Sequence, residues 1–81
     1  MTVVARAFVL ITVETGSEDE VLTKLRNMKR VKAAYLVYGI YDLIANVEAE
    51  TVEELKDAVL TEVRGLEKVA STVTLIEVTP Q

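Results

Sequence analysis

The sequence predicts an α+β fold in which a four-stranded antiparallel sheet carries two helices on one of its faces. Two observations lead to this prediction. Strand-like and helix-like stretches follow one another in the order β-α-β-β-α-β. The second β-α-β half also repeats the first, with a helix about one turn (~3.6 residues) longer. Because such crossovers are right-handed, both helices are expected on the same side of the sheet.

The first half opens with a strand expected over 3–14, where β-branched residues are frequent and both faces are largely apolar. One face carries Ala5, Ala7, Val9, Ile11 and Val13, and the other carries Arg6, Phe8, Leu10 and Thr12. A helix is expected over 17–29, because Ser17 and Glu20 have the spacing of a capping box. Its acidic first turn suits the helix dipole, although a metal site is the alternative reading of those acids.

A strand expected over 31–38 closes the first half, and strict alternation would put Val31, Ala33, Tyr35 and Val37 on one side. The second half has a strand over 42–48 and a helix over 51–64. Thr51 and Glu54 form its capping box, and Gly65 is placed for a C-terminal cap. The last strand is expected over 69–79, with its two faces formed by Ala70, Thr72, Thr74, Ile76 and Val78 and by Ser71, Val73, Leu75 and Glu77.

The link between the second and third strands concentrates polar groups in a short apolar stretch, Val37 to Leu43. Gly39 can turn the chain at positive φ without a Cβ penalty, so a hairpin is expected there. Two tyrosine hydroxyls and the Asp42 carboxylate gather at this hairpin. They either satisfy local backbone groups or form a small-molecule site, and both readings remain open at this point.

Length and composition predict a single domain over residues 1–81 that needs a second copy of itself. An 81-residue chain buries only ~60% of its unfolded surface, yet 51% of its residues are hydrophobic. One sheet face is left without helices in this fold. We expect apolar residues on it, namely Phe8, Leu10, Ile44, Thr74 and Ile76. Packing sheet against sheet in a dimer is the simplest way to cover them.

Several function classes are disfavoured by what the sequence lacks. It has no Cys and no His, which removes thiolate chemistry, zinc sites and the usual general base, and fits a reducing, cytoplasmic compartment. The net charge of −4 argues against independent nucleic-acid binding. The apolar run from Val3 to Val13 is far shorter than the ~20 residues needed to cross a bilayer, so no membrane association is expected.

The chain resembles a known family over nearly its whole length. The residues that carry the resemblance are Ala7 to Ile11, Glu20-Val21 with Leu25, Val31 to Tyr35, Gly39 to Leu43, and Val69 to Thr74. Together they resemble the RAM (effector-binding) domain of the Lrp/AsnC, or feast/famine, transcription regulators. The Gly-x-Tyr-Asp turn and the late Thr-x-Thr are specific in combination. The resemblance implies a ferredoxin-like fold that dimerises through the sheet face as a dimeric α/β barrel.

The resemblance also implies a function and a site. It implies an amino-acid effector, no cofactor, and dimers that assemble into a ring of eight or ten chains. Gly39, Tyr41 and Asp42 would lie at a cleft between dimers, with Thr72 and Thr74 as candidate polar lining. A carboxylate suits an α-ammonium, and backbone N–H groups opened by glycine suit an α-carboxylate. The chain begins at its first strand, without a helix-turn-helix, so it looks like a stand-alone RAM domain that could co-assemble with full-length regulators.

Two other functions stay open. The same architecture hosts small dimeric enzymes, because fold does not determine function. In that case Tyr35, Tyr38, Tyr41 and Asp42 would be the only plausible acid-base groups. A purely structural assembly module, which binds no ligand, is the second alternative.

Overall fold

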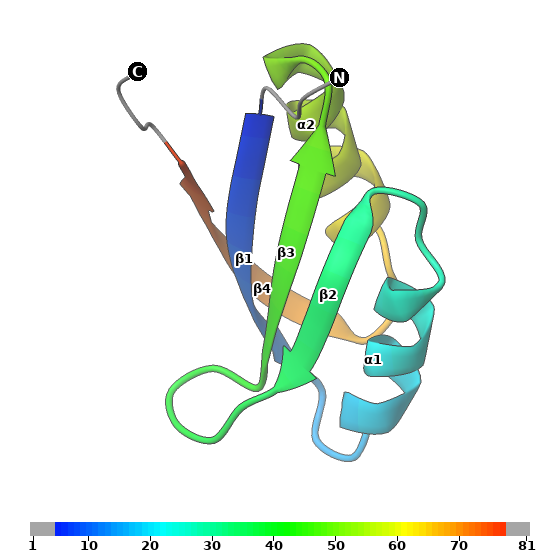
Figure 1. Ribbon diagram of the computed structural model, residues 1–81. Coiled ribbons are helices and arrows are strands. Elements are labelled where there is room, and N and C mark those ends of the chain that lie inside the picture. Colours follow the sequence, from blue (N-terminus) through cyan, green and yellow to red (C-terminus); the bar gives the residue numbers. More distant parts are fainter. Residues whose placement is uncertain (1–4, 78–81) are drawn as a thin grey trace.

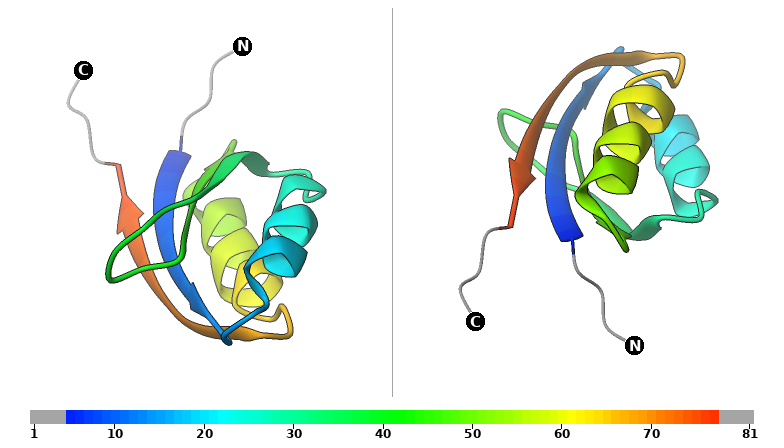
Figure 2. Two further views of the ribbon diagram at one scale, coloured as in Figure 1. Left: turned by 90° about the horizontal axis from the view of Figure 1, so that it is seen from below. Right: turned by 90° about the horizontal axis from the view of Figure 1, so that it is seen from above.

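The computed structural model describes residues 5–77 and confirms the predicted order of elements. The chain runs through β1 (Ala5–Val13), α1 (Glu18–Arg26), β2 (Val31–Leu36), β3 (Leu43–Ala49), α2 (Val52–Asp57), the π-helical turn η1 (Ala58–Val63) and β4 (Val69–Ile76). The four strands form one antiparallel sheet in the order β2-β3-β1-β4 (Figure 1). Within residues 5–77, all the helices lie on one face of this sheet, and no element covers the other, bare face (Figure 2).

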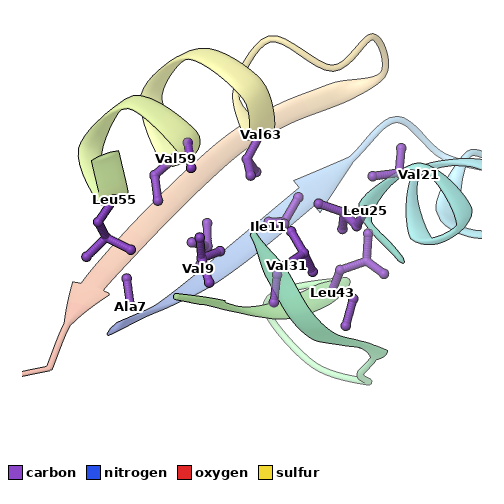
Figure 3. Close-up of a cluster of buried hydrophobic side chains, with 14 of the residues drawn as sticks. Ala7, Val9, Ile11, Val21, Leu25, Val31, Leu43, Leu55, Val59 and Val63 are labelled. Carbon is purple, nitrogen blue, oxygen red and sulfur yellow. The ribbon is translucent and has the colours of Figure 1, made fainter. Parts of the chain in front are cut away.

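The hydrophobic core lies between the sheet and the helices, as the alternation of the central strands predicts (Figure 3). β1 buries every second side chain, and β3 does the same. α1 contributes Val21 and Leu25, which are fully buried. α2 and η1 contribute Leu55, Val59 and Val63. The strands supply these residues from one face only, and each helix supplies them from one side. The position of the apolar residues therefore decides which side of the sheet the helices cover.

The two capping boxes have different outcomes. The Thr51 hydroxyl accepts a hydrogen bond from the Glu54 N–H at 3.1 Å, which confirms the start of the second helix. Ser17 makes no such side-chain bond, so the capping box predicted for the first helix is wrong. Ser17 is instead buried, and its own N–H donates to the carbonyl of Glu14. The acidic side chains of the first turn of α1 stabilise its N-terminus through their interaction with the helix dipole.

The second helix widens after Asp57 into the π-helical turn η1, and it does not end at a left-handed glycine. The C-cap predicted at Gly65 is therefore wrong; the described non-glycine residue with positive φ is Lys68, at 77°. Gly65 has a different requirement. A Cβ there would collide with the carbonyl oxygen of Thr61, so close packing of the backbone after η1 demands a residue without a side chain.

β2 contains an irregularity that reverses its predicted faces. Its register against β3 shifts between Val31 and Ala33, which leaves one extra residue in β2. Val31 and Ala34 therefore point into the core, whereas Tyr35 pairs with Ile44 on the bare face. Strict alternation predicted Tyr35 on the same face as Val31, and this prediction is wrong. One inserted residue moves every later side chain of the strand to the opposite face.

β4 also presents the opposite face from the one expected. Thr74 pairs with Val9 and Ile76 pairs with Ala7, so both share the helix-covered face with the core residues of β1. Leu75 pairs with Phe8, and Val73 pairs with Leu10. Leu75 and Val73, and not Thr74 and Ile76, therefore lie on the bare face. Both faces of this strand carry apolar residues, so its sequence pattern does not identify the inner one. The predicted end of the strand beyond residue 77 lies outside the described residues.

Candidate functional site: the 37–42 turn and the open face

The link between β2 and β3 is a six-residue turn over residues 37–42, longer than the tight hairpin expected. It is anchored at its base by backbone hydrogen bonds. The Val37 N–H donates to the carbonyl of Asp42 at 3.0 Å, and the Asp42 N–H donates to the carbonyl of Ile11 at 2.9 Å. One hydrogen bond therefore joins the two ends of the turn, and another attaches the turn to β1, although the turn projects well away from the sheet (Figure 1).

Gly39 adopts a φ of 153°, which confirms that the turn needs a residue free of a Cβ. The residues beside it are apolar and point into solvent. Tyr38 is fully exposed, and Ile40 is 87% exposed. Tyr41 and Asp42 are half-buried at the end of the turn that leads into β3. The structure thus brings three of the predicted site residues together, namely Gly39, Tyr41 and Asp42.

The Asp42 carboxylate already has a structural role. Its Oδ2 accepts a hydrogen bond from the Val13 N–H at 2.9 Å, across 29 positions of the chain. Together with the Asp42 N–H bond to Ile11, this fastens the turn to the last residues of β1. No other side-chain hydrogen bond of Asp42 occurs within residues 5–77, so Oδ1 retains its capacity to accept one. The backbone groups of Ile11 and Val13 carry no signal in the sequence that could have identified them.

Thr72 and Thr74 lie elsewhere in the same chain. Thr72 pairs with Ile11 on β1, which in turn pairs with Leu43 on β3. With strands ~4.8 Å apart, Thr72 is about 10 Å from the start of β3. Both threonines are half-buried on the helix-covered face, whereas the turn projects on the opposite side of the sheet (Figure 2). Within one chain they therefore do not share a pocket with the turn.

The bare side of the sheet, here called the open face, is apolar over most of its area. Its apolar members are Phe8, Leu10, Tyr35, Ile44, Val73 and Leu75. Leu75 is 52% exposed and Phe8 is 38% exposed, although both lie within regular strands. A contiguous apolar surface of this kind marks an interaction site more often than a solvated face.

One end of the open face is polar. Arg6 on β1 donates from Nε to Glu48 Oε2 at 3.0 Å, and its Nη1 lies 3.2 Å from Glu77 Oε1. The Asn46 amide nitrogen is 3.5 Å from the same Glu48 oxygen, while its Oδ1 is buried without a hydrogen bond in the described part of the chain. The sequence identifies Arg6 as a strand residue but does not reveal this cluster, because its members come from β1, from β3 and from the residue that follows β4.

Within residues 5–77, no three acidic side chains are grouped so that they could hold a metal ion. Glu18, Asp19 and Glu20 lie in the first turn of α1, where the helix dipole favours negative charge. No helix among these residues has both the length and the apolar character needed to cross a bilayer.

The chain has relatives among known families and solved structures. The family model of the Lrp/AsnC ligand binding domain matches residues 6–79. No curated protein sequence matches the chain. Among solved structures, FFRP-DM1 is 39% identical with a TM-score of 0.89, over 93% of this chain and 100% of that one. The Pyrococcus horikoshii protein PHS023 is 38% identical with a TM-score of 0.88, over 95% and 93% of the two chains.

A larger regulator shares the fold at lower identity. AsnC from E. coli is 22% identical with a TM-score of 0.85; the match covers 94% of this chain but only 52% of AsnC, so the chain spans about half of that protein. A Neisseria meningitidis transcriptional regulator, solved as a complex with L-Met, has a TM-score of 0.80 at 13% identity; the match covers 93% of this chain and 50% of that one. The family match over 6–79, joined with the β-α-β-β-α-β sheet, shows that this chain belongs to the Lrp/AsnC ligand-binding domain family.

Proposed function

We propose that this chain is a non-enzymatic effector module that binds a free amino acid at the 37–42 turn and assembles through its open face. Membership of a ligand-binding domain family carries the regulatory part of this proposal. The observation that carries the site is the Asp42 carboxylate, which is held by Val13 and keeps one oxygen free of hydrogen bonds within residues 5–77. The L-Met complex of the Neisseria regulator supports an amino acid as the class of ligand.

The turn offers complementary groups for both ends of an amino acid. A fixed carboxylate oxygen is suited to an α-ammonium group, because a charge-assisted bond gains strength from a preorganised acceptor. The space beside Gly39 is open, since nothing lies within 4 Å of the place where a Cβ would be. Backbone N–H groups in such an open turn can receive an α-carboxylate. Tyr41 stands beside them as a further hydrogen-bonding side chain.

Thr72 and Thr74 enter this proposal only through a neighbouring chain. They are half-buried on the helix-covered face, and Thr72 is about 10 Å from the start of β3 in its own chain at ~4.8 Å per strand. A cleft that used both the turn and the threonines would have to form between copies. This is consistent with a site between dimers in a ring of eight or ten chains, and with co-assembly with longer regulators of the family.

The decisive test replaces Asp42 with Asn. An amide oxygen at this position can still accept the Val13 N–H, while the negative charge that would hold an ammonium group is gone. Thermal-shift screening with the twenty common amino acids first identifies the ligand. Calorimetry on Asp42→Asn should then show roughly ten- to hundredfold weaker binding, as expected for the loss of a hydrogen bond worth about 1.5–3 kcal/mol between charged groups.

Asp19→Asn is the matched control, because it removes the same charge from an exposed residue of α1, on the side of the sheet opposite to the turn (Figure 2). Its affinity for the amino acid should equal that of the unmodified protein. Equal affinity of Asp42→Asn and Asp19→Asn would exclude Asp42 from the ligand site. Absence of any amino-acid-dependent stabilisation would instead favour a purely structural module.

A further inference from the structure

We propose that the side-chain hydroxyls of Thr12 and Ser71 receive the side chain of the bound amino acid and select an uncharged polar one. The inference rests on the proposed function, because it takes the ammonium group of the ligand to be held at Asp42. It supplies, within a single chain, the polar lining that Thr72 and Thr74 cannot provide from the helix-covered side of the sheet.

The two hydroxyls face each other across β1 and β4. Thr12 pairs with Ser71 in the ladder, and the oxygens of the two side chains are hydrogen-bonded to each other. Thr12 lies on the open face, because its neighbours Ile11 and Val13 are buried against the helices. Ser71 shares that face through its pairing with Thr12. The open face therefore carries a pair of hydroxyls at the end opposite to Arg6.

Ser71 reaches the open face only through a β-bulge in β4. The pairing of β4 with β1 shifts between Thr12 and Val13, and Ala70 is the extra residue. Val69 packs against the core, so strict alternation along β4 would turn Ser71 toward the helices as well. The extra residue turns its hydroxyl to Thr12 instead. Bulges of this kind commonly re-aim a side chain beside a functional site.

The hydroxyl pair lies beside the residue proposed to hold the ammonium group. Asp42 donates its N–H to the carbonyl of Ile11, and its Oδ2 accepts the N–H of Val13. These two residues flank Thr12 in the chain, so Asp42 is about one strand spacing (~4.8 Å) from Thr12. The turn also projects on the side of the sheet away from the helices (Figure 2). An amino acid held at Asp42 therefore has a short side chain within reach of the hydroxyl pair.

Two hydroxyls joined in this way can both donate and accept a further hydrogen bond. Whichever oxygen accepts the bond within the pair keeps its own hydrogen, and both oxygens keep a lone pair. No further hydrogen bond of Thr12 or Ser71 side chains occurs within residues 5–77. A hydroxyl or a carboxamide on the ligand matches this combination. An apolar side chain would displace water without replacing its hydrogen bonds, and an acidic one would be repelled by Asp42.

The test compares ligands of nearly the same shape that differ in polarity. These are L-threonine with L-valine, L-asparagine with L-leucine, and L-glutamine with L-methionine. Calorimetry on the unmodified protein should show that the polar member of the best-binding pair binds roughly tenfold more tightly, as expected for a hydrogen bond to the hydroxyl pair. In Thr12→Val this preference should fall to near unity, because valine keeps the branched shape of threonine without its hydroxyl.

Ser71→Ala is the second variant, and it should reduce the preference in the same direction, so the test does not depend on one variant folding. Thr23→Val is the matched control, since it makes the same substitution at an exposed position of α1, on the helical side of the sheet. Its ligand preference should equal that of the unmodified protein. The ratio compares two ligands on one protein, so a change in stability alone does not alter it.

The outcomes separate the hydroxyl pair from the amino-acid site itself. If the unmodified protein binds an amino acid and Asp42→Asn weakens this binding, the proposed function stands. The hydroxyl pair is nevertheless wrong if the protein prefers an apolar or a charged side chain, or if the preference for a polar one persists in both Thr12→Val and Ser71→Ala. If no amino acid binds to the unmodified protein, the proposed function fails and the role of the hydroxyl pair fails with it.

Discussion

At the scale of single residues, the side chain of Asp42 can have a structural role in the turn and a role in ligand binding at the same time. Its carboxylate does accept a hydrogen bond from a backbone N–H, but that of Val13 on β1 and not a local one as the turn reading expected; the ligand reading remains a proposal. The two roles do not exclude each other, because a carboxylate has two oxygens and about four lone-pair directions. Removal of the whole side chain would disturb both roles at once, so substitution by Asn is the variant that separates them.

Gly39→Val is expected to destabilise the fold by roughly 1–3 kcal/mol, the cost of holding a residue with a Cβ in an unfavourable backbone conformation. The cause would be conformational alone, because φ is 153° and no atom lies within 4 Å of the point that a Cβ would occupy. Urea denaturation measures the change. Ile40→Ala, one residue away and highly exposed, should alter the stability of a single chain very little. Equal stability of Gly39→Val and the unmodified protein would mean that the turn readily adopts another conformation.

At the scale of elements, Gly65 shows that a glycine after a helix can be required for another reason than a C-terminal cap. Gly65 follows the helix, as a C-cap glycine does, but its φ is not among the positive values. What excludes a side chain is the Thr61 carbonyl oxygen, which the widened turn of η1 brings against the following backbone. The glycine itself indicated that a residue without a side chain is needed at position 65. The close approach of the Thr61 carbonyl oxygen, which is the reason, could not be predicted from the residue type.

Gly65→Ala should therefore destabilise the protein, by about 1–3 kcal/mol, the usual cost of forcing extra atoms into a packed site. Helix propensity alone would predict the opposite sign, because alanine is the better helix former. The melting temperature decides between the two. Thr61→Ala provides the control, since it removes only the exposed hydroxyl that bonds to Asp57 and the methyl group beside it, and leaves the Thr61 carbonyl in place.

At the scale of the whole molecule, the two sides of the sheet have different tasks. The helix-covered side buries a continuous core whose residues run from Ala5 to Val63, and the open face keeps large apolar residues within reach of solvent. The apolar character of the open face supports the assembly that we propose, in which a second copy covers it.

Light scattering at micromolar concentration should give at least twice the mass of one 9.0 kDa chain. Leu75→Glu should shift this mass toward a single chain, because an unpaired charge buried between two sheets is strongly unfavourable. Leu60→Glu is the matched control, with the same substitution at a similarly exposed position on η1. A mass near 9.0 kDa for the unmodified protein at these concentrations would contradict the proposed assembly.

The isolated chain should not bind duplex DNA specifically at physiological salt. Its net charge is −4, and Arg6 and Arg30, two of its cations, are paired with Glu48 and Glu54. Phosphate binding needs a concentration of unpaired positive charge, which this distribution does not supply. A gel shift that is sequence-specific and weakens with added salt would overturn the expectation.

The sequence by itself determined the order of elements, which residues of β1 and of β3 share a face, and the need for glycine at position 39, because each depends on local periodicity or on the conformational range of one residue. Only the tertiary structure decided the outward face of Tyr35, the inward face of Thr74 and the bond between Asp42 and Val13. The first follows from one extra residue in β2, and the second from the pairing of a strand that is apolar on both faces. The third joins groups 29 positions apart, one of them a backbone N–H that every residue except proline possesses.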